Sequence, residues 1–158
     1  LRFFLKKDIN SLIKSGIKIK ILGELSSFPD DIINLLNKSV SLSKNNKKLN
    51  LIIAINYGSR QEITFAVKKI VREALIDKIK INDITEKTIN NFLYTEGLPD
   101  PDLIIRTGGD CRLSNFLLWQ SAYSELLFIK KAWPDFTKDD FLHAVKEFNN
   151  RERRFGGL

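Results

Sequence analysis

Hydrophobic residues alternate with polar ones or run together in short apolar blocks, and these two patterns predict four strands. Isoleucines alternate with lysines over residues 16–23, as in a half-buried strand near the edge of a sheet. Residues 49–55, LNLIIAI, form a continuous apolar run, which is typical of an inner parallel strand covered on both faces. Two more short strands are predicted at residues 101–107, PDLIIRT, and 125–129, ELLFI.

Between these strands, apolar residues recur every three or four positions, which predicts helices. The opening segment, residues 1–14, is amphipathic, and residues 29–45 carry one apolar face. The clearest helix is predicted at residues 63–75, where an apolar stripe covers four turns. Residues 85–94 are expected to form a short helical piece, and residues 137–150 a closing helix.

The closing helix is expected to begin at a capping box made by Thr137 and Asp140. Its inward-facing residues are expected to be Phe141, Val145 and Phe148. The alternation of strands and helices predicts an α/β fold, with a mostly parallel central sheet flanked by helices and connected by right-handed crossovers. We expect residues 1–158 to belong to a single domain, because 158 residues can bury one sizeable core.

Two loops follow predicted strands, and ligands of such sheets bind beyond the carboxyl ends of the strands. The first loop is NYGSR, residues 56–60, and the second is RTGGDCRLS, residues 106–114. Both contain glycine and arginine, which suits an anion that the backbone approaches closely. The sequence therefore favours a diphosphate as the ligand.

Charge and cysteine content narrow the class of protein. The net charge is +7 and the pI is near 9.5, but the lysines are spread along the chain, which indicates a solvated surface. We therefore expect no nucleic-acid partner; the rival, a basic nucleic-acid-binding module, predicts affinity that falls steeply with salt. Cys111 is the single cysteine, so no internal disulfide can form and a reducing cytoplasmic setting is the default. No apolar run is long enough for a transmembrane segment.

Arginine is scarce and unevenly placed. The chain has 18 lysines and 8 arginines, and five of these arginines lie in its last third. They are Arg106, Arg112, Arg151, Arg153 and Arg154. A planar guanidinium is needed where phosphate or carboxylate is bound by two parallel hydrogen bonds. Arg106 and Arg112 flank a Gly-Gly turn and are candidates for anion binding, although salt bridges to acidic neighbours are an alternative reading.

Other side chains with chemical potential are less suggestive. His143, the only histidine, lies on the closing helix and has no serine or cysteine machinery around it, so a structural role is expected. Cys111 beside Arg112 has no partner base in the sequence, which argues against a catalytic thiol. Glu125 begins an apolar run, where an uncompensated carboxylate is costly to bury. We expect Glu125 to hold a cation or an arginine.

The segment 99–158 contains PDPDLIIRTGGDCRLSNFLLWQSAYSELLF, then WPDF, then RERRFGG. This run resembles the C-terminal signature of the cis-prenyltransferases, the family of undecaprenyl diphosphate synthases and isoprenyl transferases. IKILGE, residues 19–24, and LNLIIAINYGSR, residues 49–60, are similar to the family in the same order. The resemblance covers the whole chain and implies the cis-prenyltransferase fold, N-terminally truncated.

The resemblance implies an enzyme that condenses isopentenyl diphosphate with an allylic diphosphate, usually farnesyl diphosphate. The product would be a long-chain polyprenyl diphosphate such as undecaprenyl diphosphate, a lipid carrier delivered to the membrane. It further implies a cytoplasmic homodimer that uses Mg²⁺. A growing isoprenoid needs an apolar cleft, and ordinary core packing is the alternative for each candidate lining residue. These candidates are Phe3, Phe4, Leu5, Ile9, Leu51 and Ile53.

The resemblance also implies roles for particular residues. Arginines like Arg106 and Arg112 and a serine like Ser114 hold the diphosphate of isopentenyl diphosphate, and a glutamate like Glu125 helps to bind Mg²⁺. The RFGG tail resembles an element that reaches the active site across the dimer interface. The substrate-binding residues expected on this basis are Arg106, Arg112, Leu113, Ser114, Arg154 and Gly156.

The chain departs from the family pattern at three positions and in its extent. Asp110 stands where family members have glutamate, Ser59 where they have glycine, and Cys111 where histidine is frequent. The family's catalytic aspartate lies in an N-terminal segment that would precede Leu1. We therefore expect no catalytic residue in this chain and no turnover by it alone. A non-catalytic scaffold subunit is the alternative, but the retained diphosphate residues favour an enzyme.

Overall fold

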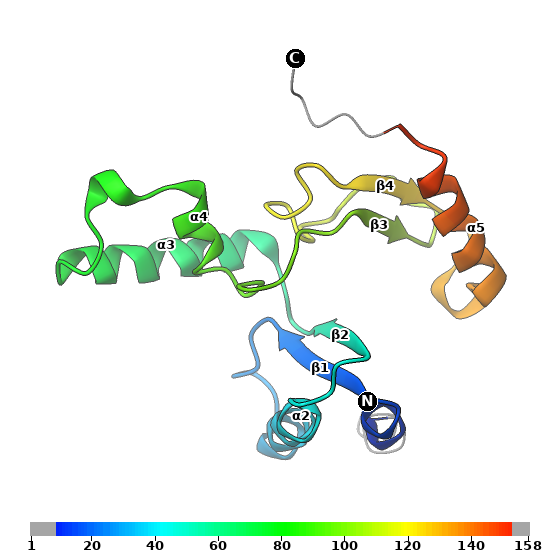
Figure 1. Cartoon of the computed structure of the whole chain (residues 1–158), viewed down its shortest axis with the longest axis horizontal. Helices are drawn as coiled ribbons and strands as arrows, with labels where there is room; N and C mark the ends of the chain where they lie inside the picture. The colour runs from blue at the N-terminus through cyan, green and yellow to red at the C-terminus, as the bar shows by residue number, and fades with distance from the viewer. Residues whose placement is uncertain (1–8, 153–158) are drawn as a thin grey trace. The chain divides into compact units, whose positions relative to one another are not determined.

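The computed structural model describes residues 9–152, which alternate between strands and helices (Figure 1). The chain divides into two compact units, Leu1–Thr95 and Glu96–Leu158, which are described separately. Each unit contains one pair of parallel strands, so the predicted α/β class with parallel strands is confirmed. The assignment of residues 1–158 to a single domain stays a prediction.

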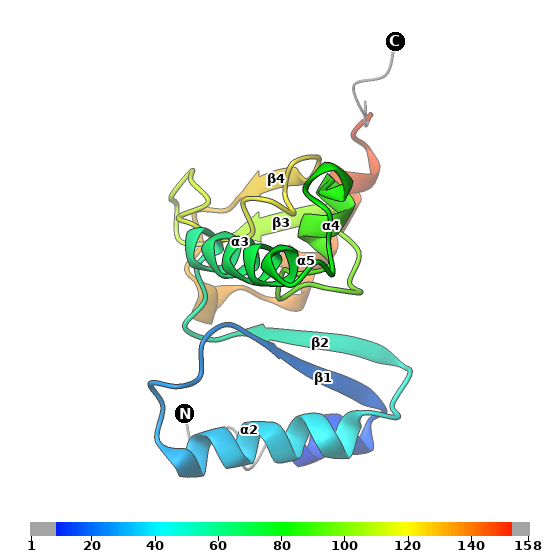
Figure 2. The same cartoon turned by 90° about the vertical axis from the view of Figure 1, so that its left-hand side faces the viewer.

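In the first unit, strand β1 (Ile17–Leu22) pairs with strand β2 (Leu49–Ala54) in parallel. The register places Ile17 opposite Leu49 and Leu22 opposite Ala54. Helix α2 (Asp30–Ser43) connects the two strands and lies along the pair (Figure 2). Residues 9–14 are helical as well. This is the β-α-β crossover that the alternating pattern predicted.

The core of the first unit lies between β1 and α2. It contains Ile9, Ile19, Ile32 and Leu36, all nearly inaccessible to water. The Ser43 hydroxyl, at the end of α2, accepts a hydrogen bond from the Ile19 backbone N–H at 2.9 Å and so fixes the helix to the strand. Of the residues expected to line an apolar cleft, Ile9 instead belongs to this core. Residues 3–5 lie outside the described residues.

The burial of the two strands is the reverse of the prediction. β1 was expected near the sheet edge and β2 as the inner strand, but Ile19 on β1 is buried, whereas Leu49 at the start of β2 is 57% exposed. The reason is that, within the described part of the first unit, α2 packs on β1. The remaining β2 residues are half-buried, or exposed at Asn50 and Ala54.

The rest of the first unit is helical. Helix α3 (Ser59–Leu75) is followed by the short 3₁₀ helix η1 (Ile81–Asp83) and by helix α4 (Glu86–Asn90). α3 and α4 contact each other. The predicted apolar stripe of α3 is buried only in part: Ala66 and Ile70 are inaccessible, while Leu75 is 78% exposed.

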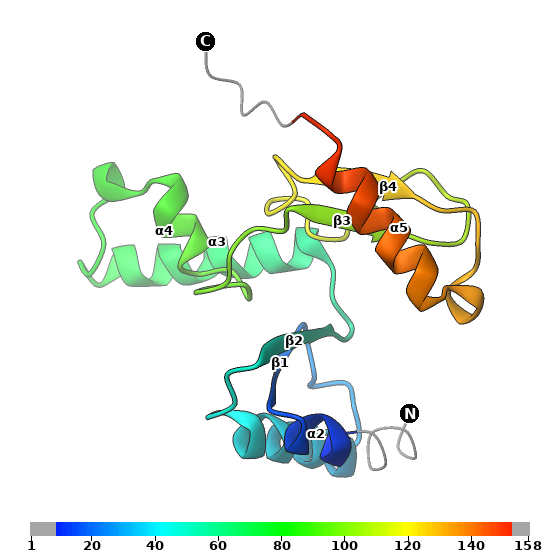
Figure 3. The ribbon, with the colours of Figure 1, turned by 45° about the vertical axis from the view of Figure 1, so that its right-hand side comes forward.

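In the second unit, strand β3 (Leu103–Arg106) pairs with strand β4 (Glu125–Phe128) in parallel. A 3₁₀ helix, η2 (Trp133–Asp135), leads into helix α5 (Lys138–Asn149), which lies next to the strand pair (Figure 3). Within residues 9–152, no helix is both long and apolar enough to cross a membrane.

The predicted capping box of α5 is confirmed: the Thr137 side chain accepts from the Asp140 N–H, and the Asp140 carboxylate accepts from the Thr137 N–H. The predicted inward face is only partly correct, because Phe141 is 49% exposed. Val145 and Phe148 are half-buried, and the buried residue of this helix is Ala144. The prediction therefore holds for Val145 and Phe148 in part, and the burial is centred on Ala144 rather than on Phe141.

Candidate functional site

The first candidate site is the loop of residues 106–114 that leaves the carboxyl end of β3, here called the arginine loop. It turns at Gly108 and Gly109, whose φ angles of +94° and +83° favour glycine. The N–H of Gly108 donates to the Lys131 carbonyl at 2.9 Å, and that of Gly109 to the Ile129 carbonyl at 3.0 Å. The segment after β4 therefore holds the turn in place.

The arginine loop brings Arg106, Arg112 and Ser114 together around one carboxylate. Arg106 Nη1 donates to the Arg112 carbonyl at 2.5 Å and to Ser114 Oγ at 2.9 Å. Arg106 Nη2 and Arg112 Nη2 both donate to the same oxygen, Oδ2 of Asp110, at 2.9 Å and 2.6 Å. Three of the residues predicted to hold a diphosphate are thus neighbours in the folded chain.

The two arginines are not equivalent. The Arg106 side chain is 25% exposed and its two terminal nitrogens are bound to three acceptors of the loop. The Arg112 side chain is 65% exposed, and among the described residues Asp110 is its one side-chain partner. Arg106 therefore shapes the loop, and Arg112 presents donors to the solvent.

A shallow depression of about 330 Å³ opens between the arginine loop and β3. Its walls combine the two arginines with apolar side chains, including Leu113, one of the predicted site residues. Its lining residues are Ile104, Ile105, Arg106, Thr107, Arg112, Leu113 and Phe116. A cavity with a few polar groups set in an apolar lining is typical of sites for small amphipathic ligands.

The backbone after the loop adopts an uncommon conformation. Ser114, Asn115 and Leu117 all have positive φ, at 48°, 65° and 46°. Left-handed backbone costs a non-glycine residue of the order of 1 kcal/mol, and such residues gather at ligand-binding segments. The side chain of Ser114 is held by Arg106 despite this strain.

Glu125, at the start of β4, pairs with an arginine. Arg151 Nη1 donates to Glu125 Oε2 at 2.8 Å, and Arg151 Nη2 donates to Glu147 Oε1 at 2.6 Å. The hydrogen bond to Glu125, followed by that to Glu147, raises the pKa of Arg151 above its ordinary value. The sequence left open a cation or an arginine for Glu125, and the structure provides Arg151.

The described residues supply too few ligands to hold a metal ion by themselves. In residues 9–152, no group of three or more histidine, cysteine, aspartate or glutamate side chains could hold a metal ion. Mg²⁺ in proteins is commonly bound through one or two carboxylates together with substrate phosphates and water. Glu125 offers one carboxylate, but it begins β4 opposite Leu103, whereas the arginine loop leaves the other end of β3, so the described residues do not form a metal site at the loop. The other predicted residues, Arg154 and Gly156, lie outside the described residues.

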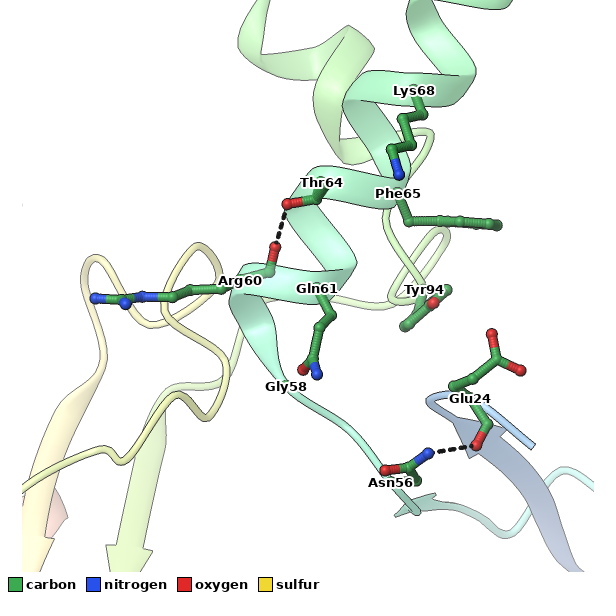
Figure 4. A pocket seen from close by; sticks show the side chains of 9 residues that line it. All are labelled: Glu24, Asn56, Gly58, Arg60, Gln61, Thr64, Phe65, Lys68 and Tyr94. Atoms are coloured by element: carbon green, nitrogen blue, oxygen red, sulfur yellow. Dashed lines mark hydrogen bonds between the residues drawn. The ribbon is translucent and has the colours of Figure 1, made fainter. Parts of the chain in front are cut away.

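A second concave site lies in the first unit and is here called the tyrosine pocket (Figure 4). It encloses about 460 Å³ and combines two basic side chains with the rings of Phe65 and Tyr94. The sequence indicated the NYGSR part of this pocket but not the rest. Its lining residues are Glu24, Asn56, Gly58, Arg60, Gln61, Thr64, Phe65, Lys68 and Tyr94.

The floor of the tyrosine pocket depends on a close backbone approach at Gly23. A Cβ at this position, where φ is +110°, would lie 2.0 Å from the Ile55 carbonyl oxygen. The approach allows the Asn56 side-chain amide to donate to the Glu24 carbonyl at 3.1 Å (Figure 4). Asn56 itself has a positive φ of 47°, whereas Ser59 does not, so the serine at that position causes no backbone strain.

Behind the tyrosine pocket lies a fully buried carboxylate, Glu62, in the first turn of α3. The Tyr57 hydroxyl donates to Glu62 Oε2 at 2.5 Å, and the Tyr94 backbone N–H donates to Oε1 at 2.7 Å. Burial, with the charges of Glu24 and Glu62, raises the pKa of Tyr94. Sequence analysis missed Glu62, because it precedes the predicted helix 63–75; the observed α3 begins at Ser59 and includes it.

Known proteins are similar to this chain in sequence and in structure. The sequence profile of the family described as "Putative undecaprenyl diphosphate synthase" matches residues 1–156. Isoprenyl transferase 2 of Bradyrhizobium diazoefficiens is 48% identical over 158 residues, which is 100% of this chain and 63% of that relative. Isoprenyl transferase of Prochlorococcus marinus subsp. pastoris is 48% identical over 154 residues, 98% of this chain and 57% of the relative.

A solved structure supports the same grouping. Lavandulyl diphosphate synthase from Lavandula x intermedia, in complex with dimethylallyl diphosphate, superimposes with a TM-score of 0.94 at 34% identity. The match covers 98% of this chain and 67% of that one. The chain therefore belongs to the undecaprenyl diphosphate synthase family of prenyltransferases, which confirms the resemblance to cis-prenyltransferases. It spans less than two thirds of the length of the two isoprenyl transferases that it matches.

Proposed function

We propose that the protein is a cis-prenyltransferase that condenses isopentenyl diphosphate with an allylic diphosphate, farnesyl diphosphate being the expected one. The product would be a long-chain polyprenyl diphosphate such as undecaprenyl diphosphate. Membership of the prenyltransferase family supports the reaction class. The substrates, the product length, the homodimer and the cytoplasmic setting rest on the resemblance and are parts of the proposal.

The observation that carries the proposal is the arrangement of the arginine loop. Arg106 positions Ser114 and the Arg112 backbone, and Arg112 directs its guanidinium into solvent beside an apolar depression. A guanidinium and a hydroxyl are donors that suit phosphate oxygens, and the apolar wall suits a five-carbon prenyl group. In the proposed complex, Arg112 and Ser114 Oγ donate to the diphosphate, and Leu113 and Phe116 contact the prenyl chain.

Mg²⁺ is part of the proposal as a companion of the diphosphate. When bound, such an ion neutralises charge that develops on a departing diphosphate. The resemblance assigns Glu125 to the ion; Arg151 Nη1 donates to its Oε2, and Oε1 is the second carboxylate oxygen that it would contribute.

The experiment is a calorimetric titration of isopentenyl diphosphate, with Mg²⁺, into the chain and into Arg112→Ala. Charge-assisted hydrogen bonds contribute roughly 1.5–3 kcal/mol, so the substitution is expected to weaken binding about tenfold to a hundredfold. Arg72→Ala is the matched control, because Arg72 is an exposed arginine on α3. This variant is expected to bind isopentenyl diphosphate as tightly as the parent.

Two results would speak against the proposal. Equal binding by Arg112→Ala and the parent would remove the arginine loop from the substrate site. An absence of binding by a parent that is folded by circular dichroism would favour the alternative, a non-catalytic scaffold subunit.

A further inference from the structure

Asp110 occupies the centre of the arginine loop. One of its carboxylate oxygens, Oδ2, accepts from Arg106 at 2.9 Å and from Arg112 at 2.6 Å. A phosphate oxygen bound by two guanidiniums would make the same two contacts. In this structure Asp110 therefore supplies the anion between the two guanidiniums.

The charges of the loop make this contact important for affinity. Arg106 and Arg112 contribute two positive charges, and Asp110 removes one of them. A diphosphate approaching Arg112 meets a guanidinium that is already paired and a carboxylate that repels it. Such interactions between partly exposed charges are screened by solvent, yet they are large enough to change binding several-fold.

Asp110 can release Arg112 without becoming isolated. If the Arg112 guanidinium turns toward a ligand, Asp110 still accepts from Arg106 Nη2, whose side chain is fixed by Ser114 and the Arg112 carbonyl. The Arg112 side chain, by contrast, is 65% exposed and has room to move. The exchange of Asp110 for a phosphate oxygen on Arg112 therefore leaves no unpaired carboxylate behind.

We propose that Asp110 is an internal competitor of the diphosphate: it holds Arg112 in the free protein and sets how tightly the arginine loop binds. This inference rests on the proposed function and extends it, because it concerns the same site. Competition would keep the affinity for the diphosphate of isopentenyl diphosphate moderate, and so favour its release from the loop after condensation, when that diphosphate belongs to the lengthened prenyl chain.

The test is a titration of inorganic pyrophosphate, without metal, into the parent, Asp110→Asn and Asp110→Glu. Asparagine keeps the size and a hydrogen-bond acceptor but removes the charge, and we expect it to tighten binding about three- to tenfold. Glutamate keeps the charge and should stay within about twofold of the parent. Asp100→Asn is the control for net charge, because Asp100 is exposed and outside the loop; no change is expected.

A second measurement needs no ligand. The rate at which phenylglyoxal modifies Arg112, followed by mass spectrometry of the peptide, should rise several-fold in Asp110→Asn, because the guanidinium loses its carboxylate partner. An unchanged modification rate would overturn the proposal.

The titrations separate this inference from the function on which it rests. Suppose that the parent binds pyrophosphate and Arg112→Ala does not. If Asp110→Asn then binds pyrophosphate no more tightly than the parent, the competition alone is overturned. Binding by neither the parent nor Asp110→Asn overturns the diphosphate function, and the competition with it.

Discussion

The arginine loop and the tyrosine pocket both place two basic side chains beside apolar ones, yet they are built in opposite ways. The arginine loop is continuous in sequence, and one half-buried carboxylate, Asp110, joins its two guanidiniums. The tyrosine pocket draws residues from positions 24 to 94, and next to it a fully buried carboxylate, Glu62, accepts from the Tyr57 hydroxyl and the Tyr94 backbone N–H. The first arrangement leaves the Arg112 side chain exposed to solvent, whereas the second buries the Glu62 carboxylate.

The comparison predicts that substitutions in the two regions have different consequences. Those beneath the tyrosine pocket should lower the free energy of unfolding, while those in the arginine loop should change ligand affinity and leave stability nearly unchanged.

The largest effect on stability is expected for Gly23→Ala. The added Cβ would lie 2.0 Å from the Ile55 carbonyl oxygen and the backbone must keep a φ of +110°, so a loss of about 3 kcal/mol in unfolding free energy is expected. Urea denaturation measures it. Gly97→Ala is the control, since Gly97 also has a positive φ but no atom within 4 Å of the new Cβ, and about 1 kcal/mol is expected. Equal losses would show that the close approach at Gly23 is unimportant.

A smaller loss is expected for Glu62→Leu. The substitution leaves the Tyr57 hydroxyl and the Tyr94 N–H without this acceptor, at a cost of about 2 kcal/mol in unfolding free energy. Glu96→Gln, an exposed position, should stay within about 0.5 kcal/mol of the parent. The affinity of the arginine loop for pyrophosphate should not change. A parallel loss of affinity in Glu62→Leu would show that the two regions are coupled.

The smallest effect concerns the cap of α5 and depends on pH. Hydrogen bonds from Lys131, then from Thr137, lower the pKa of Asp140 far below its ordinary value of 3.8. Because the folded-state pKa is the lower one, this contribution to stability is complete above pH 3.8 and is lost as the pH falls toward the folded-state pKa. Asp140→Asn should therefore lower the Tm by a few degrees at pH 7, with the deficit shrinking below pH 3.

The control for the cap is the neighbouring Asp139→Asn, which changes the same charge in the same helical turn. Its Tm difference from the parent should be smaller at pH 7. A deficit of Asp140→Asn that persists undiminished at pH 2 would contradict the ionic origin of the cap.

The sequence was most informative where structure depends on neighbours in the chain. The alternation at 16–23, the capping box of α5 and the Gly-Gly turn between two arginines are local signals, and each corresponds to an observed feature. Burial was harder to predict, because it depends on which elements pack together. Leu49 and Phe141 have the periodicity of core residues and are exposed.

The two candidate sites differ in the same respect: one is formed by neighbours in the sequence and the other by residues far apart in it. Arg106, Arg112 and Ser114 lie within nine residues, so their proximity followed from one turn. For Asp110 the sequence showed only that it replaces a glutamate of the family, because an oxygen shared by two arginines depends on three-dimensional geometry. The contact between Glu62 and Tyr94 spans 32 residues, and no local pattern indicates it.

The most direct measurement is a crystal structure of this chain with isopentenyl diphosphate and Mg²⁺. The two regions offer the ligand different cations, so the position of the diphosphate decides between them. We predict diphosphate oxygens within about 3 Å of the Arg112 guanidinium and Ser114 Oγ, with Arg112 no longer bound to Asp110. A diphosphate bound instead to Arg60 and Lys68 in the tyrosine pocket, with the Arg112–Asp110 pair intact, would contradict the assignment of the diphosphate site to the arginine loop.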